Sequence, residues 1–341
     1  MKRSLQNISA LITLGTLLSK AGGLGRQIVI AGVFGVGTAY DAYNYAYILP
    51  GFFLILIGGI NGPLHNGIVT VLSRRDTKEG KYILSSINNS LILILVIVSA
   101  FLFLLADYII TILGPGLDSN THLIATEQLK IMSPVIILSG LIGVGFGSLN
   151  ARGKFFIPSI SPIITSIVLI VSVSVFGLFQ NQDSSSLNIL LRGGKLLAYA
   201  TLIGALLQWL IQLPALRKEE LFPIKLFINW RHSGVKEVWR IIIPATLSSG
   251  MLQINVITDL FFASNITAAA AGLSYANFLV QAPLGLISNA LLLPLLPEFS
   301  KLSEEKDHKE LVKRIRQGFI FASASMICLG SMFITLSEPI T

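Results

Sequence analysis

Long apolar stretches alternate with short polar interruptions along almost the whole chain of 341 residues. Nine of these stretches approach or exceed the roughly 20 residues that a helix needs to cross a bilayer. They cover residues 5–35, 43–72, 84–113, 123–149, 157–179, 190–215, 238–263, 271–296 and 316–338. The interruptions are short and most of them resemble turns, so successive spans should run in opposite directions. The pattern predicts an all-α polytopic membrane protein with about nine transmembrane helices.

Basic residues gather in alternate interruptions. Of the 25 Lys and Arg residues, 20 lie at the N-terminus and near residues 74–81, 152–154, 217–240 and 301–316. The opposite loops hold none; these lie near residues 36–41, 114–122, 180–188 and 264–270. Because Lys and Arg are retained on the cytoplasmic side, the N-terminus is predicted to be cytoplasmic. The net charge of +8 therefore reflects topology and does not indicate a nucleic-acid partner.

One basic stretch differs from the other loops. Residues 227–241 combine Trp230 and Trp239 with several charged residues, which is typical of an amphipathic helix lying in the membrane interface. We therefore predict an interfacial helix there.

Composition excludes several function classes. Hydrophobic residues make up 53% of the chain and charged residues 12%, against about 25% charged residues in soluble domains. The single cysteine and four scattered histidines offer no disulfide framework and no metal-ligand spacing. The glycine-rich run 32–37 has no preceding strand and no following Lys-Ser/Thr, so it does not indicate a nucleotide loop. We expect neither an enzyme nor a bound cofactor or metal.

Charged residues interrupt the first apolar stretch. Lys20 and Arg26 lie within the first predicted span, and Asp41 follows it. A charged residue at the centre of a lipid-facing helix costs about 2.5–3.5 kcal/mol on insertion scales, so each needs water or a partner. One interpretation is a water-filled cavity that attracts anions; the other is a structural ion pair with Asp41 or Asp259. On an ideal helix Lys20 and Arg26 point about 120° apart, so a shared face needs a bend or a wide cavity.

The second span carries a polar line of its own. Asn61, His65 and Asn66 are spaced so that they lie near one another on a helix. Inside a membrane such residues either hold helices together or line a pathway. For His65 the sequence favours the first of these roles.

Two motifs link the chain to a known family. Residues 19–53 read "SKAGGLGRQIVIAGVFGVGTAYDAYNYAYILPGFF", and residues 148–162 read "SLNARGKFFIPSISP". Both resemble the MurJ (MviN) lipid II flippases of the multidrug/oligosaccharidyl-lipid/polysaccharide exporter superfamily, whose corresponding patterns are S-R-x-x-G-x-x-R-D, F-G, D-A-F and Pro-Asn, then L-N-x-x-x-[RK]-F-x-I-P. The positions in register are Ser19-Lys20, Gly23, Arg26, Phe34-Gly35, Asp41-Ala42, Pro50, Leu149-Asn150, Lys154-Phe155 and Ile157-Pro158.

The resemblance implies a function. Such proteins flip the lipid-linked peptidoglycan precursor, lipid II, across the bacterial cytoplasmic membrane by alternating access for cell-wall synthesis. Lys20 and Arg26 would meet its diphosphate, and Asp41 would serve an outer gate or balance charge. With no ATP site in the sequence, an ion gradient or the membrane potential would drive the cycle. The expected partners are the precursor and membrane lipids, with cell-wall synthesis proteins as further candidates.

Departures from the family pattern concentrate on basic residues. The Pro-Asn pair reads Pro50-Gly51, a basic residue shortly after it is Leu54, and the eighth-span A-D-R pattern ends in Phe278. The cavity would thus keep about half of the basic residues that the family pattern implies. Asn61 or His65 could assist in holding the diphosphate, or the substrate differs.

The family has fourteen spans, so nine predict a truncated chain. The resemblance divides it into a six-helix N-terminal lobe (1–216), a cytoplasmic or interfacial linker (217–237) and a partial C-terminal lobe of about three helices (238–341). Two alternatives to the flippase stay open. One is another transporter of the superfamily, for polysaccharide-lipids or for drugs with cation coupling, although a basic first span disfavours cationic drugs. The other is a non-transporting membrane scaffold.

Overall fold

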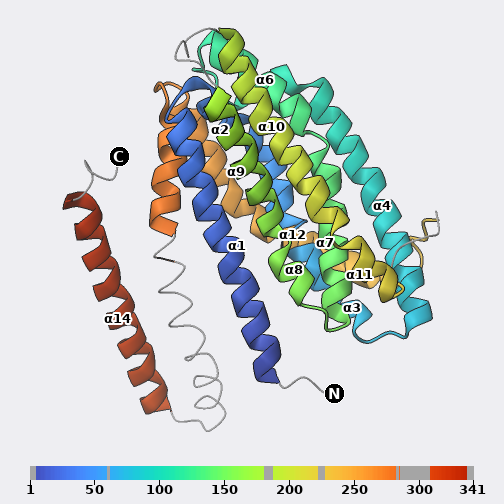
Figure 1. Cartoon of the computed structure of the whole chain (residues 1–341). Helices are drawn as coiled ribbons and strands as arrows, with labels where there is room; N and C mark the ends of the chain where they lie inside the picture. Colours follow the sequence, from blue (N-terminus) through green and yellow to red (C-terminus); the bar gives the residue numbers. More distant parts are fainter. Residues whose placement is uncertain are drawn as a thin grey trace. The chain divides into compact units, whose positions relative to one another are not determined.

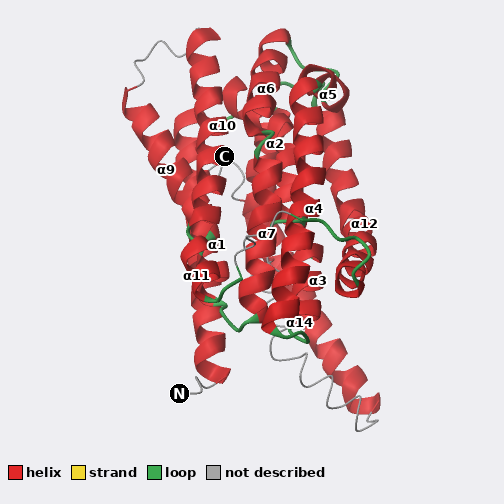
Figure 2. Cartoon of the chain, turned by 90° about the vertical axis from the view of Figure 1, so that its right-hand side faces the viewer, coloured by secondary structure: helices red, strands yellow, loops and turns green. Residues whose placement is uncertain are grey.

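The computed structural model describes residues 5–59, 62–179, 187–221, 227–281, 284 and 308–335. All regular secondary structure in this part of the chain is helical, as Figure 2 shows. The chain divides into two compact units, Met1–Ala271 and Gly272–Thr341. The all-α class is as predicted, whereas the boundaries of the two lobes and the linker stay a prediction.

The first unit is a bundle of long helices with shorter ones at its ends (Figure 1). Its helices are α1 (Leu5–Phe34), α2 (Thr38–Leu56), α3 (Pro63–Leu72), α4 (Thr77–Leu104), α5 (Ala106–Leu113), α6 (Ser119–Met132), α7 (Val135–Ala151), α8 (Phe156–Ile160), α9 (Pro162–Phe179), α10 (Leu187–Leu210), α11 (Leu213–Lys218) and α12 (Ser233–Ala263). Residues 269–281 are also helical, and α14 (His308–Thr335) belongs to the second unit.

Several predicted spans are broken into two helices. The span at 43–72 consists of α2 and α3, separated where glycines 58, 59 and 62 interrupt the apolar run. The span at 123–149 consists of α6 and α7, which meet at an angle of 42° beside Pro134. The spans at 84–113, 157–179 and 190–215 likewise each contain two helices.

By length and composition, five helices in the described part could cross a membrane, or six if α6 and α7 form one span. The predicted spans at 5–35 and 43–72 are helical but are not among them. Most of the predicted span at 271–296 lies outside the described residues. A helical membrane protein with several spans is therefore confirmed, and the number nine stays a prediction.

The predicted interfacial helix at 227–241 is wrong in its first half. Residues 227–232 are not helical, and α12 begins only at Ser233. The Nδ1 atom of His232 accepts a hydrogen bond of 3.2 Å from the backbone N–H of Gly234, which caps the helix there. Trp230 and Trp239 stack with ring centroids 5.6 Å apart, so the aromatic pair joins the loop to the helix.

Helix α1 packs closely on α8 and α9 through small residues. An added Cβ at Gly15 would lie 2.9 Å from the Cβ of Ser159, and one at Gly22 would lie 2.8 Å from Ile163. Between them, the hydroxyl of Ser19 donates a 2.9 Å hydrogen bond to the carbonyl of Ser159. Small residues allow this close approach, as is common between membrane helices. The contact fixes the segment of α1 that precedes Arg26.

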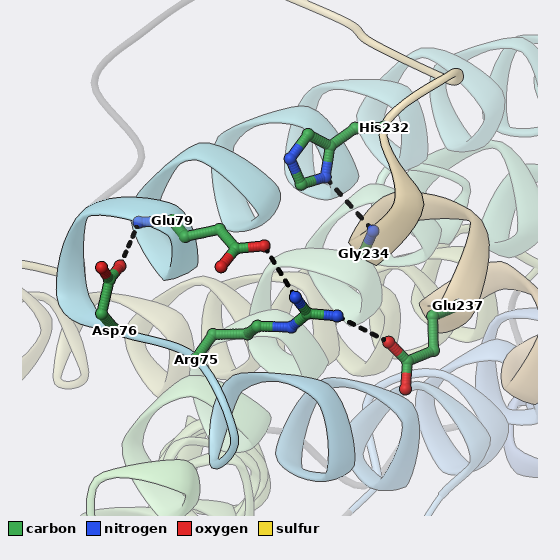
Figure 3. Close-up of polar contacts among 6 residues, drawn as sticks. All are labelled: Arg75, Asp76, Glu79, His232, Gly234 and Glu237. Atoms are coloured by element: carbon green, nitrogen blue, oxygen red, sulfur yellow. Dashed lines mark hydrogen bonds and ion pairs between the residues drawn. The ribbon is translucent and has the colours of Figure 1, made fainter.

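The Ser233 end of α12 is joined to the preceding helices by ion pairs (Figure 3). The Arg75 guanidinium lies 2.9 Å from a carboxylate oxygen of Glu79 in the first turn of α4, and 3.2 Å from one of Glu237 in α12. All three side chains are about one-third exposed. Close packing adds to this, because a Cβ on Gly67 would lie 3.0 Å from Ile242.

The Ala263 end of α12 and the segment after it are held by neutral donors and one carboxylate. The hydroxyl of Tyr45 donates to the carbonyl of Leu260 at 3.2 Å. The N–H of Gly116 donates to the hydroxyl of Ser264 at 3.1 Å. Both ends of α12 thus contact the preceding helices, whereas its middle is largely exposed.

Candidate substrate site

Arg26 is a half-buried cation whose charge is not paired with any acidic residue that the structure describes. It lies on α1 next to Gln27, whose side-chain oxygen accepts a hydrogen bond from the hydroxyl of Tyr40 on α2. Within the described part of the chain, its guanidinium makes no ion pair and no hydrogen bond. The structural ion pair with Asp41 or Asp259, the alternative that the sequence left open, is not formed. A cation kept in this state is available to an anionic ligand.

Tyrosine rings on α2 line the region beside Arg26. Tyr40 and Tyr43 stack with centroids 6.0 Å apart, and Tyr43 and Tyr47 stack at 5.3 Å. The hydroxyl of Tyr40 donates to Oε1 of Gln27 on α1 at 3.1 Å, and that of Tyr43 lies 2.8 Å from the hydroxyl of Thr201 on α10. The tyrosines therefore connect α2 to α1 and α10. None of these tyrosines was among the site residues predicted from the sequence, although their repetition in "AYDAYNYAY" (39–47) was a visible signal.

Lys20 lies on the same helix but is exposed. It forms no ion pair with any described residue. It precedes Arg26 by six residues, which on a helix turns it about 120° away. The structure does not bring the two cations to one contact.

Asp41 is buried, with a relative exposure of 5%. Its Oδ1 accepts a 2.9 Å hydrogen bond from the backbone N–H of Ala271, at the start of the helix 269–281. A carboxylate at a helix N-terminus is stabilised by the free N–H groups and by the helix dipole. Asp41 thus joins α2 to the segment that follows α12.

A polar pocket of about 190 Å³ adjoins Asp41. Besides Asp41, its polar lining comes from Thr38, Asp118, Thr121, Ser264, Asn265 and Thr267. Partial burial by itself would raise the pKa of Asp118. Hydrogen bonds from the hydroxyl and N–H of Thr121 and from the N–H of Asn120 outweigh this effect, so the pKa lies below its ordinary value. Asp118 in this way caps α6 in its charged form.

His65 is buried between two asparagines. Its Nε2 accepts a 2.7 Å hydrogen bond from the side-chain amide of Asn150 on α7, which leaves Nδ1 to donate to Oδ1 of Asn66 at 3.1 Å. Both ring nitrogens are engaged, which favours a role in holding α3 to α7. Asn61 lies outside the described residues.

No group of three or more His, Cys, Asp or Glu side chains suited to a metal ion occurs among the residues that the structure describes. Arg26, Asp41 and His65 do not form one cluster. Arg26 lies beside tyrosines, Asp41 beside a helix start, and His65 between amides.

A bundle with five or six helices long and apolar enough to cross a membrane places the described part of the chain among polytopic helical membrane proteins. The family model described as "Lipid II flippase MurJ" matches residues 30–341, and the chain belongs to this family.

Individual relatives agree with this assignment. A protein of Synechocystis sp. named "Probable lipid II flippase MurJ" is 46% identical over 338 residues, which is 99% of this chain and 63% of that protein. The "Lipid II flippase MurJ" of Burkholderia cenocepacia is 28% identical over 337 residues, 94% of this chain and 63% of that protein. The chain therefore spans a little under two thirds of the length of these relatives.

Solved structures show the same fold. One described as "Lipid II flippase MurJ, inward closed conformation" has a TM-score of 0.76 and 24% identity, covering 97% of this chain and 66% of that one. A multidrug resistance MATE family transporter in an outward-facing conformation has a TM-score of 0.57 and 14% identity, covering 98% and 72%. At these identities the likeness concerns the fold alone.

Proposed function

We propose that this chain works as a flippase for the lipid-linked peptidoglycan precursor, lipid II, moving it across the bacterial cytoplasmic membrane by alternating access. Membership of the family and the names of the relatives support this function. The observation that carries it is Arg26, a half-buried guanidinium without a described partner. A diphosphate on a lipid is an anion that such a group can bind strongly.

Within this proposal the site residues take different roles. Arg26 contacts the diphosphate, and Lys20, which is exposed and unpaired in the described part, contacts it from another side. Asp41 holds the helix start at Ala271 and acts as part of a gate on the outer side. His65 supports the site indirectly by joining α3 to α7, and Asn61 remains a candidate contact.

The proposed orientation places the N-terminus in the cytoplasm. It rests on the 20 basic residues at the N-terminus and in alternate loops. The Ser233 end of α12, beside Arg75, is then cytoplasmic, and the pocket at Asp41 is on the outer side. Reactivity of single cysteines at positions 78 and 119 with an impermeant thiol reagent tests this, since only the second should react in intact cells.

The function can be tested in cells depleted of their own flippase. Expression of the complete reading frame should restore lipid II exposure on the outer face of the membrane. Arg26→Ala should reduce this exposure by about tenfold or more, the amount that loss of a charge-assisted contact predicts. Arg192→Ala removes an exposed arginine of α10 and serves as the matched control.

The outcomes separate the alternatives. A protein that inserts but restores no exposure would contradict the lipid II function and favour another substrate of the same fold, as the MATE likeness allows. Restored exposure that Arg26→Glu leaves unchanged would exclude Arg26 from the site. If the protein is a non-transporting scaffold, neither Arg26→Ala nor Arg26→Glu should change the exposure of lipid II.

A further inference from the structure

An open apolar groove of about 560 Å³ lies between α4 and the loop that precedes α12. It is lined by Asn89, Ile92, Leu93 and Val96 of α4 and by Phe227 and Ile228 of the loop. The four residues of α4 recur at intervals of three and four, so they share one face of the helix. Leu93 and Val96 are 52% and 43% exposed, and α4 is long and apolar enough to cross a membrane. The groove therefore faces hydrocarbon.

The loop side of the groove is fixed to α4 by polar contacts. The side-chain amide of Asn89 donates a 3.0 Å hydrogen bond to the carbonyl of Phe227. The backbone N–H of Asn229 donates to the hydroxyl of Ser86 at 2.8 Å, and its side-chain amide donates to the hydroxyl of Tyr82 at 2.7 Å. The rings of Tyr82 and Phe227 pack with centroids 4.6 Å apart. Both walls are thus in place before a ligand arrives, so binding does not have to order the loop.

Two exposed basic residues, Lys78 and Arg231, lie beyond one end of the groove. Lys78 is one turn before Tyr82 on α4. The backbone N–H of Arg231 donates a 3.0 Å hydrogen bond to Oδ1 of Asn229, the same side chain whose amide donates to Tyr82. Neither cation forms an ion pair with a residue that the structure describes. Tyr82 precedes Asn89, where the groove begins, by about 10 Å along the helix, so both charges lie on the polar side of the groove.

We propose that this groove is a binding site for an anionic phospholipid of the membrane, with an acyl chain against Leu93 and Val96 and the phosphate beside Lys78 and Arg231. Apolar walls that continue into unpaired cations match the chain and the charged headgroup of such a lipid. Trp230, which is 46% exposed next to Arg231, is of the residue type enriched where headgroups begin. The site lies on the outside of α4 and goes beyond the proposed transport function.

The experiment uses native mass spectrometry of the purified 341-residue chain in detergent micelles, and it measures the affinity for the first bound lipid. The probes are phosphatidylglycerol, which is anionic, and phosphatidylethanolamine with the same acyl chains, which is zwitterionic.

One variant, Lys78→Gln with Arg231→Gln, removes both charges, and another, Val96→Trp, fills the groove. The control for the first is Arg192→Gln with Lys218→Gln, which removes two other exposed cations. The control for the second is Val175→Trp, at an exposed valine of α9 outside the groove. Thermal unfolding of every variant is compared with that of the unmodified chain.

We expect the unmodified chain to bind phosphatidylglycerol about tenfold more tightly than phosphatidylethanolamine, as two basic residues near the headgroup predict. Removing both charges should lower the affinity for phosphatidylglycerol to that for phosphatidylethanolamine and leave the latter unchanged. Val96→Trp should weaken binding of both lipids by about fivefold or more, because the indole takes the place of the acyl chain. The two controls should keep the affinities and the preference of the unmodified chain.

Each contrary outcome overturns the proposed lipid site. An unmodified chain that does not prefer phosphatidylglycerol has no anionic lipid site here. A preference that survives the loss of Lys78 and Arg231, or that the control pair removes equally, comes from charge elsewhere on the protein. Unchanged binding in Val96→Trp shows that no acyl chain lies in the groove. A dimer in the same spectra that Val96→Trp dissociates shows that a second copy of the chain covers it. The transport proposal stands or falls separately, by lipid II exposure in cells.

Discussion

The two ends of α12 contact the preceding helices by different chemistry. At the Ser233 end, Arg75 bridges two carboxylates, and all three side chains are partly exposed. At the Ala263 end, the contacts are a buried tyrosine hydroxyl and a backbone N–H, and Asp41 caps the helix start that follows. Exposed ion pairs are weak and screened by salt, whereas a buried hydrogen bond resists salt and is costly to leave unmade. We therefore expect the contacts at the Ser233 end to weaken as the salt concentration rises and those at the Ala263 end to keep their strength.

Substitution of Asp41 should have the largest effect on this comparison. Asp41→Ala removes the acceptor of the buried Ala271 N–H, and an unsatisfied buried group costs about 1–3 kcal/mol. Amide hydrogen exchange at Ala271 should rise by at least about fivefold, with no change at the Ser233 end. Asp107→Ala, at an exposed aspartate, is the control. Unchanged exchange at Ala271 would show that the cap contributes nothing to holding this segment.

Removing the Tyr45 hydroxyl should have an intermediate effect. Tyr45→Phe keeps the ring, which is only 1% exposed, and deletes one hydrogen bond to the Leu260 carbonyl. The expected loss of unfolding free energy is about 0.5–1.5 kcal/mol, measured by denaturant titration in micelles. The same loss should be found at low and at high salt. A marked salt dependence would contradict the contrast between the ends.

The ion pair at the Ser233 end should give the smallest effect. A double-mutant cycle with Arg75→Ala and Glu237→Ala should yield a coupling of about 0.2–1 kcal/mol, because both side chains are partly exposed. The coupling should fall when sodium chloride is raised from 0.05 to about 1 M, since screening shortens the range of the charges. A coupling that is larger and insensitive to salt would mean that this contact is effectively buried.

The sequence was sufficient to predict the helices but not all of their breaks. Apolar length identified each long segment, and glycines at 58, 59 and 62 marked the break after α2. The break between α4 and α5 occurs at Leu105, whose backbone leaves the helical region without any Gly or Pro. The interfacial helix was wrong because the tryptophans stack across a helix start, which periodicity alone does not reveal.

The charged residues of the candidate site could be predicted from the sequence, whereas the uncharged residues packed around them could not. Arg26 was identified because a charge within an apolar stretch is conspicuous, and its lack of an acidic partner agrees with one of two interpretations. Tyr47 was missed because an aromatic residue in such a stretch is expected to be ordinary packing. Gly51, a departure from the family pattern, makes sense only once the Tyr47 ring is seen against it. That relation depends on side-chain packing, which no spacing rule contains.

The proline within α12 has a mechanical consequence. Pro244 has no N–H for the carbonyl one turn earlier, so the helix bends more easily there. Beyond it, Leu247 and Met251 are each 69% exposed, and little packing opposes a change of curvature. Because both ends of α12 are attached, a change of curvature at Pro244 would leave the end contacts in place, and the two halves of the helix would tilt relative to each other.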